Sequence, residues 1–293
     1  MGATPFSEDQ PLELQALKQH PSHWSEHATT WDHFGPPLRP HPIDMAFVAT
    51  QVAALKKAQA GKTLNALLLG VTPEYALLPW PAGTVFTAVD QSADMIAKVW
   101  PSKHLPHSFK ALAGQWTTLP LASGTVDLAM GDGISTVLPH WSFMDTILAE
   151  LHRVCAPGAT VILRLFVKPD APDSLAQLMS DLETGALQGF HSFKLRLLML
   201  LQENLRDGVQ PRLAWQVWHQ LRAQHAASIA ARQWPPEVMN TIEAYAQSHD
   251  TYWFPTMNQA LASIEKYFTP RQIQHSDVEL GGRCPLYVLE RRS

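Results

Sequence analysis

The chain has 293 residues, of which 26 are acidic and 22 are basic, so its net charge is −4. Hydrophobic residues make up 46% of the chain, which is enough for a large core without disulfides or structural metals. This composition excludes an intrinsically disordered chain, and the small negative charge gives no general attraction to nucleic acid or to anionic membranes. The length suits one large domain, or one domain with a sizeable insertion.

The cysteines, the histidines and the hydropathy exclude further classes. Cys155 and Cys284 are too few for a disulfide framework or a Cys-rich zinc site. The chain carries 14 histidines, but it has neither an H-E-x-x-H motif nor a Cys/His ligand pair, so we expect no metal. No apolar run approaches 18 residues, and the N-terminus carries Glu8 and Asp9 in place of an apolar leader. We therefore expect a cytoplasmic protein that neither spans nor binds a membrane.

The first 60 residues are predicted to form an N-terminal arm with helices. The pattern favours a short helix near 10–19, followed by an extended segment, because the density of proline up to residue 42 opposes both helix and strand pairing. Asp44 is expected to cap a helix that runs to Lys57 and ends before Gly61.

Strands and helices alternate in the next part of the chain. Five apolar or β-branched runs predict strands over 65–70, 84–90, 108–112, 126–131 and 159–167. Helical patterns lie between them over 92–100, where Ser92 is the expected N-cap, and over 141–155. Continuous apolar strands that alternate with helices indicate a parallel sheet that is covered on both faces.

This alternation stops after residue 170. Helical patterns cover 174–185, 190–207, 213–231, 236–247 and 257–267, and two late strands are expected over 272–280 and 286–291. The predicted fold is α/β, with a Rossmann-like, doubly wound, mostly parallel seven-stranded sheet and a helical insertion after the fifth strand. We expect the arm over 1–60, the core over 61–170 and 251–293, and a helical substrate cap over 171–250.

The strongest chemical signal is the run LLLGVTPE over 67–74, followed by Asp90 at the end of the second predicted strand. A tight turn at Gly70 brings backbone N–H groups to a ligand, and an acidic residue twenty positions later can accept hydrogen bonds from a ribose diol. A pyrophosphate would need further glycines, where this chain has Pro73 and Glu74. A carboxylate at that point favours a cofactor with a ribose and a cationic end.

These motifs resemble those of the class I S-adenosylmethionine-dependent methyltransferases. The resemblance covers about 62–168 and the closing strands, and it includes AGQW over 113–116, LPLASGTVDL over 119–128 and LHRVCAPG over 151–158. It implies that S-adenosylmethionine is the cofactor and that positioning supplies much of the catalysis. The cofactor-binding residues implied by the matching positions are Gly70, Thr72, Glu74, Asp90, Gln91, Met95, Gly114, Gln115, Trp116, Gly131 and Asp132. Asp132 and His140 are the candidate catalytic residues.

The chain departs from the family pattern at two places. Thr72 and Glu74 stand where the family has glycines, and Gln115 stands where it has an aspartate. We expect methyl transfer to a small molecule in a pocket that the helical insertion closes, with no nucleic-acid partner and a possible homodimer. The altered glycine motif leaves two alternatives open, namely transfer of the aminocarboxypropyl group and a non-catalytic binding subunit.

Overall fold

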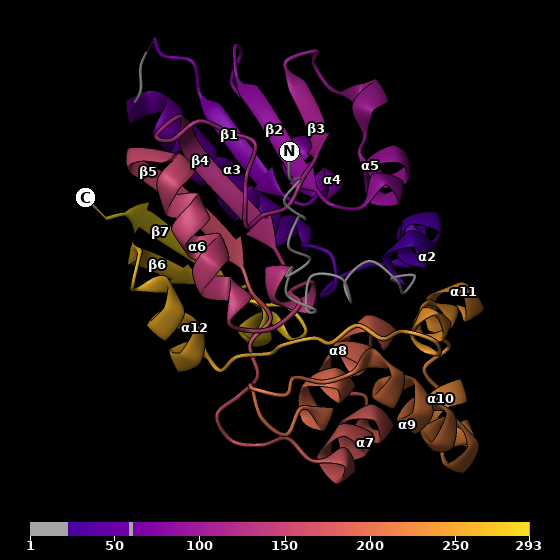
Figure 1. Ribbon diagram of the computed structural model, residues 1–293. Helices are drawn as coiled ribbons and strands as arrows, with labels where there is room; N and C mark the ends of the chain where they lie inside the picture. The colour runs from indigo at the N-terminus through magenta and orange to yellow at the C-terminus, as the bar shows by residue number, and fades with distance from the viewer. Residues whose placement is uncertain (1–22, 59–60, 293) are drawn as a thin grey trace, which may run out of the picture.

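A computed structural model describes residues 23–58 and 61–292 and confirms the predicted α/β sheet. Its seven strands lie in the order β3-β2-β1-β4-β5-β7-β6 (Figure 1). The first five strands are parallel, β7 runs antiparallel to β5, and β6 runs antiparallel to β7. The strands are β1 (Asn65–Leu69), β2 (Val85–Asp90), β3 (Phe109–Ala113), β4 (Val126–Asp132), β5 (Cys155–Arg164), β6 (Phe268–Gln274) and β7 (Leu286–Arg291).

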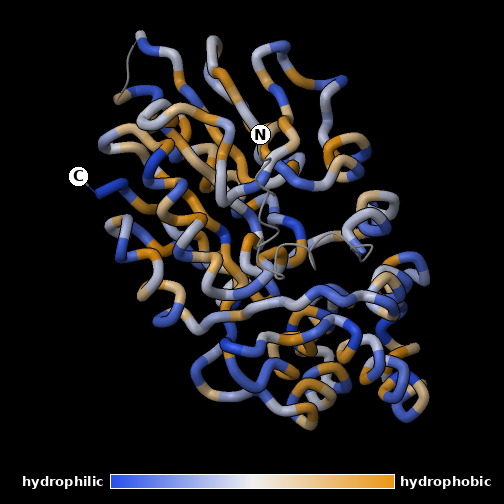
Figure 2. Tube along the Cα trace, in the orientation of Figure 1, coloured by the Kyte–Doolittle hydropathy of each residue, from blue (hydrophilic) through white to orange (hydrophobic). Residues whose placement is uncertain are grey.

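Both faces of the sheet are covered by helices, as the continuous apolar strands predict. In β1, Leu67 and Leu69 belong to one hydrophobic cluster, whereas Ala66 and Leu68 belong to another on the opposite face. The central strands accordingly follow hydrophobic stretches of the tube in Figure 2. Helices α3 (Pro42–Ala58), α4 (Pro73–Ala76) and α5 (Ala93–Val99) cover the second face, and α6 (Phe143–Val154) and α12 (Met257–Ile264) cover the first.

The helices that follow β5 have a hydrophobic core of their own, and we call them the cap. They are α7 (Leu175–Thr184), α8 (Phe190–Leu201), α9 (Pro211–Gln224), α10 (Ala226–Ala230), α11 (Pro236–Met239) and the 3-10 helix η4 (Asn240–Tyr245). Helix α8 lies at their centre, with ten of its twelve residues buried. The cap lies beyond the carboxyl ends of the parallel strands (Figure 1).

The segment before α3 was expected to be extended, and this was wrong for part of it. Residues Trp24–Thr29 form helix α2 and Trp31–His33 form the short 3-10 helix η1. Phe34 is extended, and a turn over 36–38 follows it, in which the Arg39 N–H donates to the Gly35 carbonyl at 3.2 Å. No proline lies between 22 and 35, so a helical turn is permitted there, and it buries His27 and Ala28 on one side. We call residues 23–41 the arm. The helix expected over 10–19 lies outside the described residues.

Several predicted boundaries are also corrected. The fifth strand covers Cys155–Arg164, and the sixth covers Phe268–Gln274 in place of 272–280. The prediction began the strand after Pro270, because a proline usually opposes strand pairing. In the structure β6 is an edge strand, which tolerates a proline, and its register shifts between Pro270 and Gln272. The helix expected over 236–247 is divided into α11 and η4. Asp44 lies inside the first turn of α3, where its Oδ2 accepts the His41 N–H at 3.1 Å, so it is not the N-cap.

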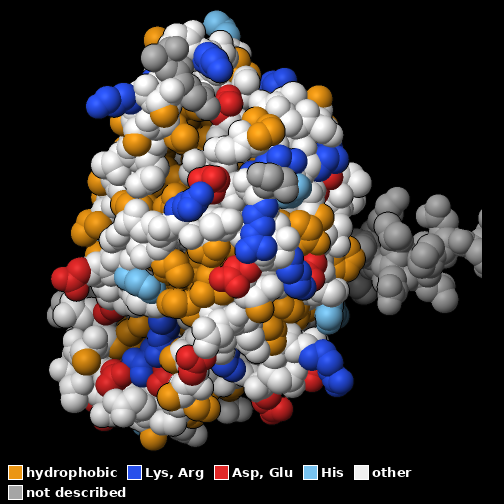
Figure 3. All heavy atoms as spheres, turned by 90° about the vertical axis from the view of Figure 1, so that its left-hand side faces the viewer, with side chains coloured by type: hydrophobic (Ala, Val, Ile, Leu, Met, Phe, Trp, Pro, Cys, Tyr) orange, Lys and Arg blue, Asp and Glu red, His pale blue; other side chains and the backbone are white. Residues whose placement is uncertain are grey.

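The surface shows mixed charge. On the face that carries β6, β7 and α12, basic and acidic side chains are interspersed among hydrophobic ones (Figure 3). Within residues 23–58 and 61–292, no helix has the length and apolar character needed to cross a bilayer.

Candidate functional site

The carboxyl ends of β1 and β2 bring three of the predicted residues together. Gly70 has a φ of +93°, which favours glycine, and its N–H donates to the Val89 carbonyl at 2.8 Å. A Cβ at Gly70 would lie 3.8 Å from Cζ2 of Trp116 and 3.9 Å from Oδ2 of Asp90. The indole of Trp116 and the carboxylate of Asp90 therefore border the turn at Gly70.

Asp90 and Trp116 are held in place by the backbone around this turn. Asp90 Oδ1 accepts the Ser92 N–H at 2.8 Å, and the Trp116 Nε1–H donates to the Val89 carbonyl at 2.7 Å. Burial raises the pKa of Asp90 to about 6, although the hydrogen bond from Ser92 acts in the opposite direction. A desolvated carboxylate beside a glycine turn is suited to accept hydrogen bonds from ligand hydroxyls.

Asp132 lies at the end of β4 in a buried ion pair with Arg164. The Arg164 Nε lies 2.6 Å from Asp132 Oδ1, and the two side chains are 1% and 5% exposed. Arg164 Nη1 also donates to the Pro37 carbonyl of the arm at 2.9 Å, and its guanidinium lies 5.1 Å from the centre of the Phe166 ring. Sequence reasoning missed Arg164, and the available signal was a charged residue at the end of an otherwise apolar strand.

Glu74 and Tyr75, at the start of α4, complete a polar cluster beside this ion pair. Glu74 Oε1 accepts from Arg39 Nε of the arm at 2.6 Å. Three buried atoms of this cluster have no hydrogen-bond partner among the described residues, namely Glu74 Oε2, the Tyr75 hydroxyl and Arg164 Nη2. Burial raises the pKa of Tyr75, and Asp132 raises it further. Buried polar atoms without protein partners are available to form hydrogen bonds with a ligand or water.

The remaining predicted cofactor residues lie at or shortly after the carboxyl ends of β1, β2, β3 and β4. Thr72 is the N-cap of α4 and is buried, while Gly114 donates its N–H to the Asp90 carbonyl at 3.0 Å. Gly131 lies under Ile134 and Leu163, where a Cβ would meet their side chains at 3.0 and 3.2 Å. The other three are Gln91 and Gln115, which are exposed, and Met95, which is buried among the residues of the second sheet face.

His140 lies apart from this cluster, in the loop that follows β4. Its Nδ1 lies 2.8 Å from Ser142 Oγ and its Nε2 lies 3.2 Å from the Arg206 carbonyl. The ring is exposed and packs edge-on against Trp253 at 5.8 Å between centroids. Both ring nitrogens are therefore engaged with loop atoms.

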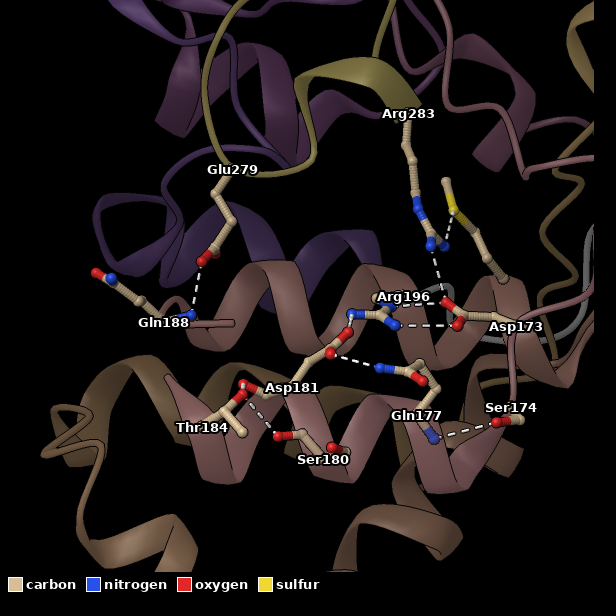
Figure 4. A network of polar contacts seen from close by, with 11 residues as sticks. Asp173, Ser174, Gln177, Ser180, Asp181, Thr184, Gln188, Arg196, Glu279 and Arg283 are labelled. Carbon is tan, nitrogen blue, oxygen red and sulfur yellow. Dashed lines mark hydrogen bonds and ion pairs between the residues drawn. The ribbon is translucent and has the colours of Figure 1, made fainter. Parts of the chain in front are cut away.

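A second polar network links the cap to the connection between β6 and β7 (Figure 4). Asp173 accepts from Arg196 Nε at 2.6 Å and from Arg196 Nη2 at 3.0 Å, and it also accepts from Arg283 Nη2 at 2.8 Å. Arg196 lies on α8 of the cap, whereas Arg283 lies in the connection between β6 and β7. The hydrogen bonds from Arg196 and then Arg283 lower the pKa of Asp173 to about 2.

Comparison with protein families identifies the part of the chain that carries the site. Residues 68–163 match the family described as "Methyltransferase domain". This segment includes Gly70, Asp90, Trp116 and Asp132, and it contains most of the parallel strands. The match supports the predicted class I, Rossmann-like methyltransferase domain in this third of the chain, for which S-adenosylmethionine is the expected cofactor. No curated protein matches the chain.

Solved structures resemble the chain at low sequence identity. A putative Zn-dependent alcohol dehydrogenase from Rhodobacter sphaeroides has a TM-score of 0.55 and 13% identity, covering 94% of this chain and 100% of that one. The N-methyltransferase NodS from Bradyrhizobium japonicum WM9, in complex with S-adenosyl-L-homocysteine, has a TM-score of 0.48 and 11% identity, covering 92% and 99%. At 13% identity, the similarity to the Rhodobacter sphaeroides structure shows the fold alone.

The donor set of the polar cluster fits this cofactor. The Tyr75 hydroxyl and Arg164 Nη2 can donate to a carboxylate, while Glu74 Oε2 can accept from an ammonium group. Asp90 can accept from ribose hydroxyls, and Trp116 offers an aromatic surface beside Gly70. Among the described residues, no group of three or more His, Cys, Asp or Glu side chains could hold a metal ion.

Proposed function

We propose that this protein transfers a methyl group from S-adenosylmethionine to a small organic acceptor, which binds between the carboxyl ends of the strands and the cap. The observation that carries this proposal is the position of the arm. Arg164 holds its Pro37 carbonyl from the sheet side, and the His191 Nε2 lies 2.9 Å from its His33 carbonyl on the cap side. Strand ends that are covered in this way favour an acceptor small enough to be enclosed.

Each residue of the polar cluster has a role in the proposal. The cofactor supplies, when bound, a methyl group on a positively charged sulfur. Asp90 accepts from the ribose, Glu74 accepts from the amino group, and Arg164 and Tyr75 donate to the carboxylate. Asp132 acts through Arg164, whose guanidinium it orients, so it is a positioning residue. The proposal does not need His140 as a base, because both of its nitrogens already have loop partners.

Calorimetric titration with S-adenosylhomocysteine tests the cofactor site. We expect a dissociation constant below about 100 μM for the unmodified protein and at least tenfold weaker binding for Asp90→Ala. A matched control is Asp94→Ala, because Asp94 lies four positions later, in the first turn of α5, with a side chain that is 47% exposed. Absence of binding at about 100 μM would contradict the proposal and favour a non-catalytic subunit.

Product analysis tests the chemistry. Incubation with S-adenosylmethionine and a panel of small phenols, amines, thiols and carboxylates should yield S-adenosylhomocysteine together with a methylated acceptor. Formation of methylthioadenosine would instead identify aminocarboxypropyl transfer. Parallel incubations with a mixed peptide pool and with RNA test the assignment of a small acceptor, and preferential labelling of either would overturn it.

A further inference from the structure

The arm meets the cap at a buried group of basic side chains. His27 of α2 is 3% exposed, while His191 and Lys194 of α8 are 5% and 0% exposed. The His27 ring lies 4.7 Å from the Phe34 ring of the arm and 5.6 Å from the Tyr245 ring of η4, between centroids. We call this contact the arm–cap seam.

The bases of the seam have few hydrogen-bond partners. Both ring nitrogens of His27 and Nδ1 of His191 have none among the described residues. Lys194 Nζ donates to Thr241 Oγ1 at 2.9 Å and lies 4.7 Å from the centre of the Phe34 ring. A charge on His27 would therefore be buried without any acceptor, and a charge on His191 would leave its Nδ1–H without one, which is costly.

The other titratable groups of the seam do not supply this acceptor to His27. His23, on the same side of α2, lies 4.6 Å from His27 between ring centroids. Its Nδ1 is 2.6 Å from Asp250 Oδ2, and its Nε2 is 2.5 Å from the Tyr252 hydroxyl. The carboxylate of Asp250 is thus directed to His23, while His27 faces His191, Lys194 and the phenol ring of Tyr245.

These surroundings disfavour a positive charge on His27, His191 and Lys194 while the arm is docked on the cap. Burial lowers the pKa of His27 well below its ordinary value, and His23 and Lys194 lower it further. Burial and then Lys194 lower the pKa of His191 to about 3, although the His33 carbonyl acts in the opposite direction. Burial also lowers the pKa of Lys194.

We propose that the arm–cap seam is an acid-sensitive latch, in which protonation of His27 and His191 releases the arm from the cap. Release would take away the contacts that the arm makes with Glu74 and Arg164 at the strand ends. The release itself does not depend on the proposed function, whereas its effect on ligand binding does.

The direction of the effect follows from proton linkage. When the arm is released, His27 on the arm and His191 on the cap return to an ordinary pKa of about 6.5, so docking is independent of their protonation above that pH. Below it, each histidine weakens docking by up to about tenfold per pH unit, and the two together weaken it by about a hundredfold at about pH 5.5.

Hydrogen–deuterium exchange of the full chain, read by mass spectrometry, tests the latch without any ligand. Between about pH 7.5 and about pH 5.5, the protection of residues 24–34, corrected for intrinsic exchange, should fall by about a hundredfold. In His27→Phe it should fall by only about tenfold, because the ring that packs against Phe34 is kept and no hydrogen bond is lost. The control is His107→Gln, an exposed histidine far from the seam, which should respond as the unmodified protein does.

His191→Gln keeps an N–H for the His33 carbonyl and provides a second test if the first variant folds poorly. Its protection should also fall by only about tenfold over the same interval. An unchanged protection of the arm at low pH in the unmodified protein would overturn the proposal. An equal response in the unmodified protein and in both variants would overturn it as well.

Discussion

Arg164 at the end of β5 and Asp132 at the end of β4 form an ion pair that is almost completely withdrawn from water. The nitrogen and oxygen lie 2.6 Å apart, and neither side chain is more than 5% exposed. Burial raises the pKa of Asp132 while the Arg164 guanidinium opposes that shift, so neither charge is stable there without the other. The pair therefore ties the carboxyl ends of two interior strands, β4 and β5, to the Pro37 carbonyl of the arm.

Removing one partner of this pair should be more harmful than removing both. Arg164→Met leaves a buried carboxylate without a partner, and we expect it to lower the free energy of unfolding by about 3–5 kcal/mol. Urea denaturation measures this loss. The double variant with Asp132→Asn should recover part of it, and Arg206→Met, at an 85% exposed side chain, should cost little. A single-variant loss as small as that of the control would show that the pair is not buried as described.

The buried carboxylate of Asp90 should lower the stability of the ligand-free protein, although it provides a hydrogen-bond acceptor for the ligand. Its folded pKa of about 6 lies above the ordinary value of 3.8, so the folded protein binds the proton more tightly and stability falls as pH rises through this interval. Asp90→Asn keeps an acceptor for the Ser92 N–H and should raise the free energy of unfolding at neutral pH by about 2–3 kcal/mol. Thermal or urea denaturation of the ligand-free protein checks this.

The same variant should bind S-adenosylhomocysteine at least tenfold more weakly, and the unmodified protein should lose affinity below about pH 6 as Asp90 is protonated. Asp94→Asn should change neither property. A variant that is both less stable and unchanged in affinity would refute the assigned role.

The sequence could predict Gly70, Asp90 and Trp116 as neighbours because all three depend on strand ends that the apolar pattern locates. It could not predict Arg39 or Arg164. Arg39 lies 35 positions from Glu74, and Pro37 lies 127 positions from Arg164, so nothing local marks these pairs. They follow from the path of the arm, which tertiary packing decides.

The strands and helices likewise divide into those that the sequence predicts and those that depend on tertiary packing. The parallel strands were predicted because their residues are buried on both faces and leave a continuous apolar run. Helix α2 was missed because its six residues are too few for a clear periodicity, and it is stabilised by packing on the cap and on α5. Pro270 concealed the start of β6, since a proline is acceptable only where an edge strand needs no N–H.

Gly133 should be intolerant of a side chain for two separable reasons. Its φ of +58° strains any other residue, and a Cβ would lie 2.8 Å from Cε2 of Phe166. Gly124 has a similar φ of +69° but open space around it. We expect Gly124→Ala to cost about 1 kcal/mol and Gly133→Ala about 2–4 kcal/mol in urea denaturation, the difference being the contact with Phe166. Equal costs would mean that Phe166 moves aside freely.

Asp173 should hold the cap to the sheet over a wide range of pH. Its side chain is 9% exposed and receives hydrogen bonds from Arg196 and Arg283, so Asp173→Asn should lower the free energy of unfolding by about 2 kcal/mol at neutral pH. The control is Asp170→Asn, at an exposed carboxylate three positions earlier, which should have little effect.

The pH dependence of this loss gives a sharper test. The folded pKa of Asp173, about 2, lies below the ordinary value of 3.8, so its contribution is complete above about pH 4 and is lost as pH falls through about 2. The stability difference between the unmodified protein and Asp173→Asn should therefore be constant between about pH 5 and about pH 7 and should shrink only below about pH 4. A difference that already falls between about pH 7 and about pH 5 would contradict the assignment to Asp173, because histidines and Asp90, and not Asp173, titrate in that interval.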